Sequence, residues 1–322
     1  TPLYPLKFHP QLKEKVWGGD KLRSVLGKTD SNNMGESWEI SGVAGNISVV
    51  SNGELIGKNL SQLIHQFKGD LMGERVYKQY DTEFPLLFKF IDAKEDLSVQ
   101  LHPNDEIAKQ RHNSFGKTEM WYVMDADEDA RLILGFNESL DETEYKKLLS
   151  ENNLVSKLHA EKVKEGDAFF IAPGTVHAIG GGIMLAEIQQ TSDITYRIYD
   201  WDRPGLDGKM RELHNEEALE VIDFNISEAK LSYQPKTNEA SLVCKSDYFS
   251  TQVIQVQGTV SMDHSDLDSF IVYMCVNGEE VTFNWDSNSE VIKKGGTILI
   301  PACLKTFDIQ SSNATLLEVF VP

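Results

Sequence analysis

Short strand-like segments separated by turns fill the middle of this 322-residue chain, and they restrict its fold more than any other feature. They are rich in β-branched and aromatic residues, and turn-forming residues stand between them. Few helical patterns interrupt them, so they favour an antiparallel sandwich or barrel over alternating βαβ units. The clearest segments are PLLFKFIDA (85–93), LSVQLH (97–102), TEMWYVMDA (118–126), ARLILGF (130–136), DAFFIAP (167–173) and IMLAEIQQTSDITYRIYDW (183–201).

Helical patterns are confined to a few inserted stretches. Residues 58–80 carry apolar residues every three or four positions, and a capping-box pattern opens a second helix near 139–150. A third helix is expected at 211–223. The sequence YQPKTN, before the last strand-rich part, predicts a linker. We therefore expect a first β domain, 1–232, that contains these insertions, and a second β domain, 233–322.

Charge and cysteine usage exclude several classes of protein. The chain has 31 basic against 50 acidic residues, a net charge of −19, which would repel nucleic acid and anionic membranes. No apolar run has the length of a membrane span, and the first residues lack a signal-peptide pattern. Cys244, Cys275 and Cys303 are scattered, as in reduced proteins. We expect a cytoplasmic protein, in which any phosphate pocket must be made positive locally.

Four side chains, distant in sequence, have the right chemistry and spacing for one metal site. Residues two apart in a strand face the same side, so Gln100 and His102 project together, as do Lys117 and Glu119. His177, after a PGTV turn, supplies a fourth candidate ligand. Two imidazoles, an amide and a carboxylate without a thiolate fit Zn²⁺ best but admit Mn²⁺, Fe²⁺ or Co²⁺. The alternative is that these histidines are hydrogen-bonded structural residues.

The second domain contains a weak echo of the first. GGTILIPACLK (295–305) parallels GDAFFIAPGTVH (166–177), since each has a Gly turn, an apolar strand and a Pro four residues before a polar position. That position is His177 in the first copy and Lys305 in the second. We expect two jelly-roll units, of which the second has no metal site.

Seven segments follow one another along residues 16–203: VWGGDKL (16–22), GESWEIS (35–41), PLLFKFIDA (85–93), LSVQLHPND (97–105), GKTEMWYV (116–123), PGTVHAIGGG (173–182) and AEIQQTSDITYRIYDWDR (186–203). Together they resemble the type I mannose-6-phosphate isomerase family, in its short bacterial form. The resemblance implies cupin β-barrels, one zinc ion per chain, and interconversion of mannose 6-phosphate and fructose 6-phosphate by a monomer or homodimer. It also carries the metal ligands onto Gln100, His102, Glu119 and His177.

The resemblance further places Lys117, Glu187, Asp193 and Arg197 in the active site. Strand alternation supports this independently, because 187, 193 and 197 would share one face of a continuous strand. An Arg among apolar strand residues needs a partner, and we expect Arg197 to face the anionic substrate. A buried ion pair with Asp193 is the alternative.

Substrate-binding candidates come from the same motifs. They are Lys89, Ser98, Trp17 and Glu36. Aromatic packing in the core explains the presence of Trp17 nearly as well as contact with the substrate does. The chain departs from the pattern of many members at two positions, where it has Ile179 and Gly116, so any role of the family side chains there is absent or moved.

Aldose–ketose isomerisation through a cis-enediolate needs a positive centre at O1 and O2 and an acid/base beside the carbons. Lys117, Glu187 and Asp193 are the candidate proton carriers, and the sequence does not choose between them.

Two other classes of cupin protein remain as alternatives to an isomerase. A metal cupin oxygenase would present a more His-rich site, and a sugar-binding regulatory cupin would not need the proton-transfer groups.

Overall fold

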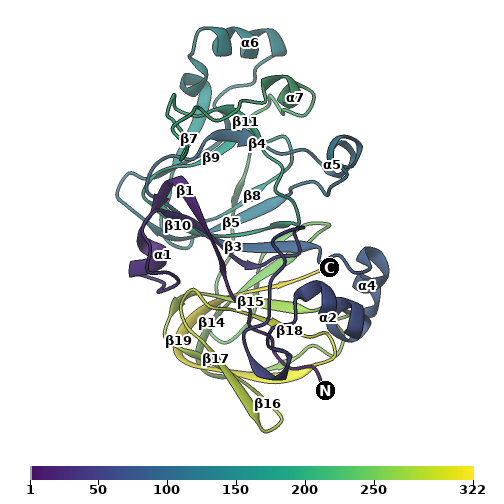
Figure 1. Ribbon diagram of the computed structural model, residues 1–322. Coiled ribbons are helices and arrows are strands. Elements are labelled where there is room, and N and C mark those ends of the chain that lie inside the picture. Colours follow the sequence, from purple (N-terminus) through teal and green to yellow (C-terminus); the bar gives the residue numbers. More distant parts are fainter. Residues whose placement is uncertain (1) are drawn as a thin grey trace. The chain divides into compact units, whose positions relative to one another are not determined.

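The computed structural model describes residues 2–322, and Figure 1 shows its strands and helices. The chain packs into two compact units. The central unit consists of Leu12–Ser37 and Phe90–Lys230, and the terminal unit contains the chain up to Gln11 together with Trp38–Lys89 and Leu231–Pro322. These units are defined by packing, so the predicted linear division between 232 and 233 stays a prediction.

Two antiparallel sheets contain the strands that matter for the site. The large sheet has the order β1-β2-β3-β10-β5-β8-β12. Its strands are β1 (Gln11–Gly19), β2 (Met34–Ile40), β3 (Leu86–Ala93), β10 (Ile183–Gln190), β5 (Glu119–Ala126), β8 (Ala168–Ile171) and β12 (Lys230–Leu231). The small sheet runs in the order β11 (Tyr196–Tyr199), β4 (Val99–Leu101), β9 (His177–Ile179), β6 (Arg131–Phe136) and β7 (Leu158–Lys162).

Strand alternation sorts the apolar residues of the central unit into two clusters. On β6, Leu132 and Leu134 join Trp121 and Leu185 of the large sheet in what we call the interior cluster. Ile133, between them, packs with the residues under the inserted helices, the cover cluster. Burial of each such side chain contributes roughly 1.5–3 kcal/mol. Both faces of the small sheet are therefore buried, and its inner face is the wall of a barrel.

The terminal unit contains a second strand-rich core. Its sheet has the order β13-β14-β19-β15-β18, and β16 pairs with β19 and β17. Tyr273, Phe283, Ile309 and Leu316 are fully buried in its core. The strands are β13 (Ser241–Lys245), β14 (Ser250–Asp263), β15 (Ile271–Gly278), β16 (Val281–Trp285), β17 (Asn288–Ile292), β18 (Thr297–Ile300) and β19 (Thr306–Phe320).

The helices are short insertions between strands. In the terminal unit, Asn59 and Gln62 form a capping box at the start of α2, within the predicted helical stretch. In the central unit, Figure 1 shows α6 and α7 at the end of the small sheet, where the cover cluster lies. The helices are α1 (Lys21–Ser24), α2 (Leu60–Phe67), α3 (Gly69–Met72), α4 (Glu74–Tyr80), α5 (Asp105–His112), α6 (Glu142–Ser150) and α7 (Asn215–Leu219), with 3₁₀ turns at Gly53–Leu55 and Leu154–Lys157.

The predicted mainly β fold is confirmed, and three local predictions need correction. The helix expected at 211–223 shrinks to α7, and α5 was not predicted. The long strand expected at 183–201 is two strands in different sheets. It breaks after β10 because the Gln189 side chain donates to the carbonyls of Gln190 and Ser192, which turns the chain. Within residues 2–322, no helix is long and apolar enough to cross a membrane.

Candidate metal centre and active site

Three neighbouring strands of the small sheet bring Gln100, His177 and Arg197 onto one face. Gln100 on β4 pairs directly with His177 on β9, and Arg197 on β11 pairs directly with Gln100. Directly paired residues of an antiparallel ladder project to the same side. Leu134, the β6 partner of His177, belongs to the interior cluster. The three polar side chains therefore face the barrel interior.

The large sheet presents acidic groups to the same interior. Glu119, the first residue of β5, pairs with Gln189 of β10, and Trp121 pairs with Glu187. Trp121 is part of the interior cluster, so Glu119 and Glu187 share its face. Lys117, two residues before Glu119, is buried, and its Nζ lies 3.9 Å from Glu119 Oε2.

His102, Glu119 and His177 converge at one buried point. One potential ligand atom from each lies within 4.8 Å of the others. Glu119 Oε1 is 3.1 Å from His177 Nε2 and 3.6 Å from His102 Nε2. His102 follows the last residue of β4, while the other two begin β5 and β9. The convergence that strand alternation predicted is therefore present for these three residues.

Backbone carbonyls orient both imidazole rings. The Nδ1 atom of His102 is 2.9 Å from the carbonyl oxygen of Ile194, and that of His177 is 2.8 Å from the carbonyl of Thr175. A carbonyl only accepts, so these contacts assign the proton of each neutral ring to Nδ1. Nε2 of each ring then turns a lone pair toward Glu119, as in histidines that bind metals.

Burial sets the charge states of this cluster. Burial, followed by the charge of Lys117, lowers the pKa of His102 to about 3, so its ring is neutral at pH 7. Burial raises the pKa of Glu119, but the neighbouring His102 and Lys117 outweigh this effect and hold the pKa well below its usual range. The cluster therefore combines a neutral His102 imidazole with a Glu119 carboxylate.

This donor set fits a divalent metal. Glu119 Oε2 is buried and accepts no hydrogen bond from residues 2–322, and Lys117 Nζ, at 3.9 Å, lies beyond hydrogen-bond distance, so this oxygen keeps a lone pair for a metal ion. The Nε2 atom of Gln100 donates to the Ser98 carbonyl at 3.2 Å, so its amide oxygen is the atom available as a ligand. Gln100 lies directly beside His177 in the sheet. His₂Glu with an amide oxygen is a nitrogen and oxygen set suited to Zn²⁺ and related ions.

Glu187 and Lys117 supply ionisable groups on the same inner surface. Trp121 Nε1 donates to Glu187 Oε2 at 3.2 Å, which orients this buried carboxylate. Lys117 is also buried. An ammonium and a carboxylate on the interior wall beside a metal cluster are groups that can hold and transfer protons.

Asp193 was expected on the same strand face as these groups, and that argument is wrong. Asp193 is exposed in the turn between β10 and β11, because the strand pattern breaks after Gln190. Arg197 faces the interior as predicted, but its nearest charges do not include Asp193. Its Nη1 donates to the carbonyl of Glu212 at 3.2 Å. The alternative of a buried Asp193–Arg197 ion pair therefore fails.

Arg197 belongs to a cluster of three arginines that the sequence did not reveal. Asp200, with a side chain 5% exposed, accepts two hydrogen bonds from Arg211, at 2.8 and 2.7 Å, and one from Arg203 at 3.1 Å. Burial, then Arg211, lowers the pKa of Arg197. The Nε atoms of Arg197 and Arg203 are buried without a hydrogen-bond partner in the described chain. Two guanidinium groups thus bind one buried carboxylate, and Arg197 lies near enough to feel the charges of all three side chains.

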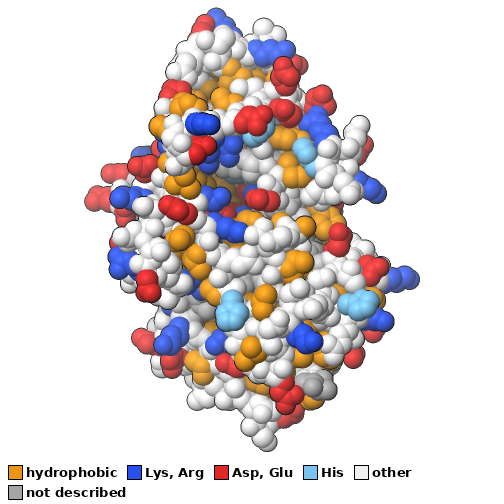
Figure 2. Space-filling model, in the orientation of Figure 1, with side chains coloured by type: hydrophobic (Ala, Val, Ile, Leu, Met, Phe, Trp, Pro, Cys, Tyr) orange, Lys and Arg blue, Asp and Glu red, His pale blue; other side chains and the backbone are white. Residues whose placement is uncertain are grey.

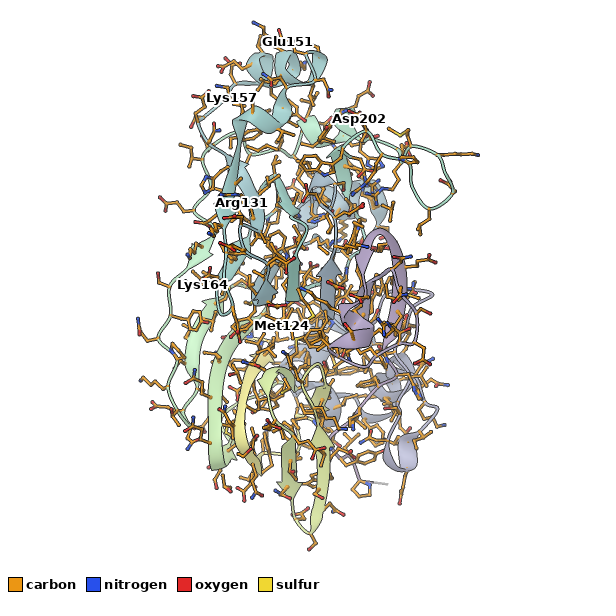
Figure 3. The ribbon with its side chains drawn as sticks, turned by 90° about the vertical axis from the view of Figure 1, so that its left-hand side faces the viewer. Met124, Arg131, Glu151, Lys157, Lys164 and Asp202 are labelled. Carbon is orange, nitrogen blue, oxygen red and sulfur yellow. The ribbon has the colours of Figure 1, made fainter. Side chains whose placement is uncertain are left out.

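The segment that brings Arg211 to this cluster is a hairpin loop. Pro204 pairs with Met210, and Gly205 N donates to the Lys209 carbonyl at 2.7 Å. Figure 3 shows the loop that follows Asp202 extending away from the strands. Figure 2 shows basic side chains, with acidic ones among them, over the part of the central unit where Figure 1 labels β4 and β9.

The remaining predicted residues lie in varied surroundings. Ser98 is buried beside Gln100, and Trp17 packs in the interior cluster. Glu36 lies 3.9 Å from the Nζ of Lys15. Lys89 belongs to the terminal unit, where its Nζ lies 4.8 Å from the ring centre of Trp38. Their contacts with substrate stay predictions.

A barrel with a buried His₂Glu cluster on its inner wall defines a metal-site cupin, and comparisons with known proteins narrow this class. Residues 5–147 match the family model for the catalytic domain of type I phosphomannose isomerase, and residues 238–321 match the cupin domain of mannose-6-phosphate isomerase. The mannose-6-phosphate isomerase of Bacillus subtilis is 36% identical over 95% of this chain and 96% of its own.

Two further comparisons agree. The mannose-6-phosphate isomerase of Streptococcus mutans is 34% identical over 94% of both chains. A crystal structure of the mannose 6-phosphate isomerase from Bacillus subtilis has a TM-score of 0.89, 30% identity, and covers 98% of this chain and 99% of that one. The chain belongs to the type I mannose-6-phosphate isomerase family.

Proposed function

We propose that this protein is a zinc-dependent aldose–ketose isomerase that interconverts mannose 6-phosphate and fructose 6-phosphate through a cis-enediolate. The observation that carries the proposal is the buried His102–Glu119–His177 cluster, with Lys117 beside it. The relatives that align over nearly the whole chain are named for this activity. A site that only bound sugar would not need buried ionisable groups next to a metal cluster.

His102, Glu119, His177 and Gln100 would hold the metal. When bound, a divalent ion supplies the positive charge that polarises the sugar carbonyl and stabilises the enediolate oxygens. Hydrogen bonds that the two rings donate to the carbonyls of Ile194 and Thr175 would keep both imidazoles in position for the metal. Zn²⁺ is proposed on the donor types, with one ion per chain.

Glu187 is the proposed proton-transfer group, and Lys117 is proposed to stabilise the charge that develops on the substrate. We assign the transfer between C1 and C2 to the Glu187 carboxylate, which Trp121 orients. Lys117 would remain an ammonium that stabilises negative charge on the sugar oxygens. Exposed Asp193 is the weaker candidate. Glu187→Gln should lose kcat with little change in KM, and unchanged kcat would assign the proton to another residue.

The arginine cluster is the proposed recognition element for the phosphate. It supplies local positive charge in a protein of net charge −19, as a dianionic substrate requires. Arg197 lies two strands from His177, or roughly 10 Å at about 4.8 Å per strand, a span on the scale of a hexose phosphate. Arg211→Gln should raise KM about tenfold or more. An unchanged KM would contradict this assignment.

A coupled assay on purified protein tests the function. Wild-type protein with Zn²⁺ should convert mannose 6-phosphate to fructose 6-phosphate, lose activity with chelator, and recover it when Zn²⁺ is restored. No turnover in metal-replete protein would contradict the isomerase assignment.

Residues 1–232 are the proposed catalytic domain, and residues 233–322 are proposed to form a degenerate jelly roll. A monomer or homodimer is proposed, which light scattering would determine.

A further inference from the structure

A hydrogen-bond network outside the metal cluster holds the chain segment that precedes Glu119. Oδ1 of Asp105, the first residue of α5, accepts from the backbone N–H of Gly116 and from Nε2 of Gln190, both at 2.8 Å. Oε1 of Gln190 in turn accepts from the N–H of Thr118 at 2.9 Å. The side chain of Gln190 thus links α5 to the start of β5.

Two further contacts complete this clamp, which consists of Asp105 and Gln190 around residues 116–118. The N–H of Lys117 donates to the Pro103 carbonyl at 3.1 Å, and Gln190 N donates to the Thr118 carbonyl at 3.1 Å. Three consecutive N–H groups, at residues 116, 117 and 118, are therefore fixed. Lys117 lies in the middle of them.

Gly116 fits the clamp because it has no side chain. A Cβ at this position would lie 2.6 Å from the backbone of Asn104 and Asp105, closer than real atoms approach. The backbone of residue 116 therefore packs directly on the first turn of α5. This turn follows the candidate ligand His102 by three residues, so the clamp joins two of the three chain segments that supply the cluster.

The helix does not need Asp105 as its cap. Asn104 is the N-cap residue of α5, and its Oδ1 accepts from Ile107 N at 3.0 Å. Asp105 instead turns its carboxylate oxygen toward the neighbouring strand. The position of the Asp105 carboxylate is explained by its role in the clamp, because it holds Gly116 directly and Thr118 through Gln190, on either side of Lys117.

We propose that Asp105 and Gln190 are positioning residues, which set the direction of the Lys117 and Glu119 side chains toward the metal and the substrate. The part that concerns turnover rests on the proposed function, but the part that concerns metal binding does not. Mutation of a residue that positions a metal ligand typically lowers metal affinity or activity by about 10–100-fold. A shift of the segment by a fraction of an ångström also reduces the rate of positioned chemistry.

The test compares Asp105→Ala, Asp105→Asn and a matched control. Zn²⁺ affinity of the metal-free protein is measured by chelator competition, and kcat and KM by the coupled assay. Asp105→Ala should weaken Zn²⁺ binding and lower kcat, each by about tenfold or more, with a smaller change in KM. Asp105→Asn keeps an oxygen acceptor and should restore both.

Asp96→Ala is the control, because Asp96 Oδ1 also accepts from a glycine N–H, that of Gly181, at 2.8 Å, but outside the clamp. It should keep the Zn²⁺ affinity and kcat of the wild type. Equal Zn²⁺ affinity and kcat in Asp105→Ala and Asp96→Ala would overturn the proposal, as would failure of Asp105→Asn to restore them. If Asp105→Ala does not fold, Gln190→Met, which loses the acceptor for Thr118 N, gives the same comparison. A wild type that binds Zn²⁺ without turnover would count against the proposed function alone.

Discussion

The central and terminal units each bury a glutamate beside a histidine, but the two clusters differ in what faces the carboxylate. In the central unit, the Nε2 atoms of two imidazoles face Glu119 Oε1, and Lys117 Nζ lies 3.9 Å from Oε2. In the terminal unit, the hydroxyl of Tyr273 donates to Glu318 Oε2 at 2.6 Å, and His264 Nε2 is 3.6 Å from the same oxygen. Burial, then Glu318, raises the pKa of Tyr273 well above its usual value, so the hydroxyl stays a donor.

The contrast shows why one cluster suits a cation and the other does not. A carboxylate with a hydroxyl donor in place is satisfied by the protein alone, whereas Glu119 Oε2 has no hydrogen-bond donor in the described residues. The sequence echo fits this difference. His177 has its counterpart in Lys305, whose Nζ donates to the Leu267 carbonyl at 2.5 Å. A cation there cannot serve as a ligand.

Histidine removal gives the largest expected difference between the two clusters. His102→Ala should abolish metal binding. It should also lower activity by more than the roughly 10–100-fold that is typical when a residue supporting a metal ligand is mutated. His264→Ala should leave metal content and kcat unchanged. Elemental analysis and the coupled assay on the same preparations measure both. Retention of one metal per chain by His102→Ala would break the contrast.

Metal removal should destabilise the protein through the central cluster only. Binding to the folded state adds about 4 kcal/mol at a free metal concentration of 1,000 times Kd. Thermal unfolding with and without Zn²⁺ should show this shift in the wild type and in His264→Ala, and not in His102→Ala. A Zn²⁺-dependent shift of equal size in His102→Ala would locate the stabilising site elsewhere.

The hydroxyl of Tyr273 should matter for stability and not for catalysis. Tyr273→Phe removes the donor to buried Glu318 and should cost about 1–3 kcal/mol of unfolding free energy, measured with urea. Tyr145→Phe is a matched control, because the buried Tyr145 hydroxyl has no hydrogen-bond partner among residues 2–322, and its loss should cost little. Reduced metal content in Tyr273→Phe would contradict the separation of the two clusters.

Acid should destabilise the metal-free protein through His102. Its pKa falls from 6.5 to about 3 on folding, so between these values the unfolded chain binds a proton that the folded chain does not. Stability is then lost as pH falls through this window, by up to about 1.4 kcal/mol per pH unit. Glu119, whose folded pKa is also lowered, adds loss in the same direction at lower pH. The slope of urea stability against pH should decrease in His102→Gln, and an unchanged slope would refute the assignment.

Much of the site could be predicted because period-two alternation survives in short strands. It predicted that Lys117 and Glu119 project together, and Lys117 Nζ lies 3.9 Å from Glu119 Oε2. It failed at Asp193, because a side-chain hydrogen bond from Gln189 ends β10 inside an uninterrupted strand-like run. Alternation assumes a continuous strand, and the hydrogen bond that breaks this one is invisible in the pattern.

The arginine cluster and the clamp were missed for a different reason. Arg203 and Arg211 lie in or next to a loop, and their common partner Asp200 follows the end of β11. Asp105 and Gln190 are 85 residues apart in sequence. These contacts form between residues that are far apart in the sequence. The periodicity of apolar residues within a single strand or helix therefore does not predict them.

The two imidazoles of the candidate metal centre donate hydrogen bonds to main-chain carbonyls and not to side chains. Every residue type carries such a carbonyl, so Ile194 and Thr175 could be exchanged for other residues with both tethers intact. Alignments of relatives would then show variable letters at two positions on which ring orientation depends. Substitution at these two positions should leave the ring orientations unchanged as long as the backbone conformation is preserved.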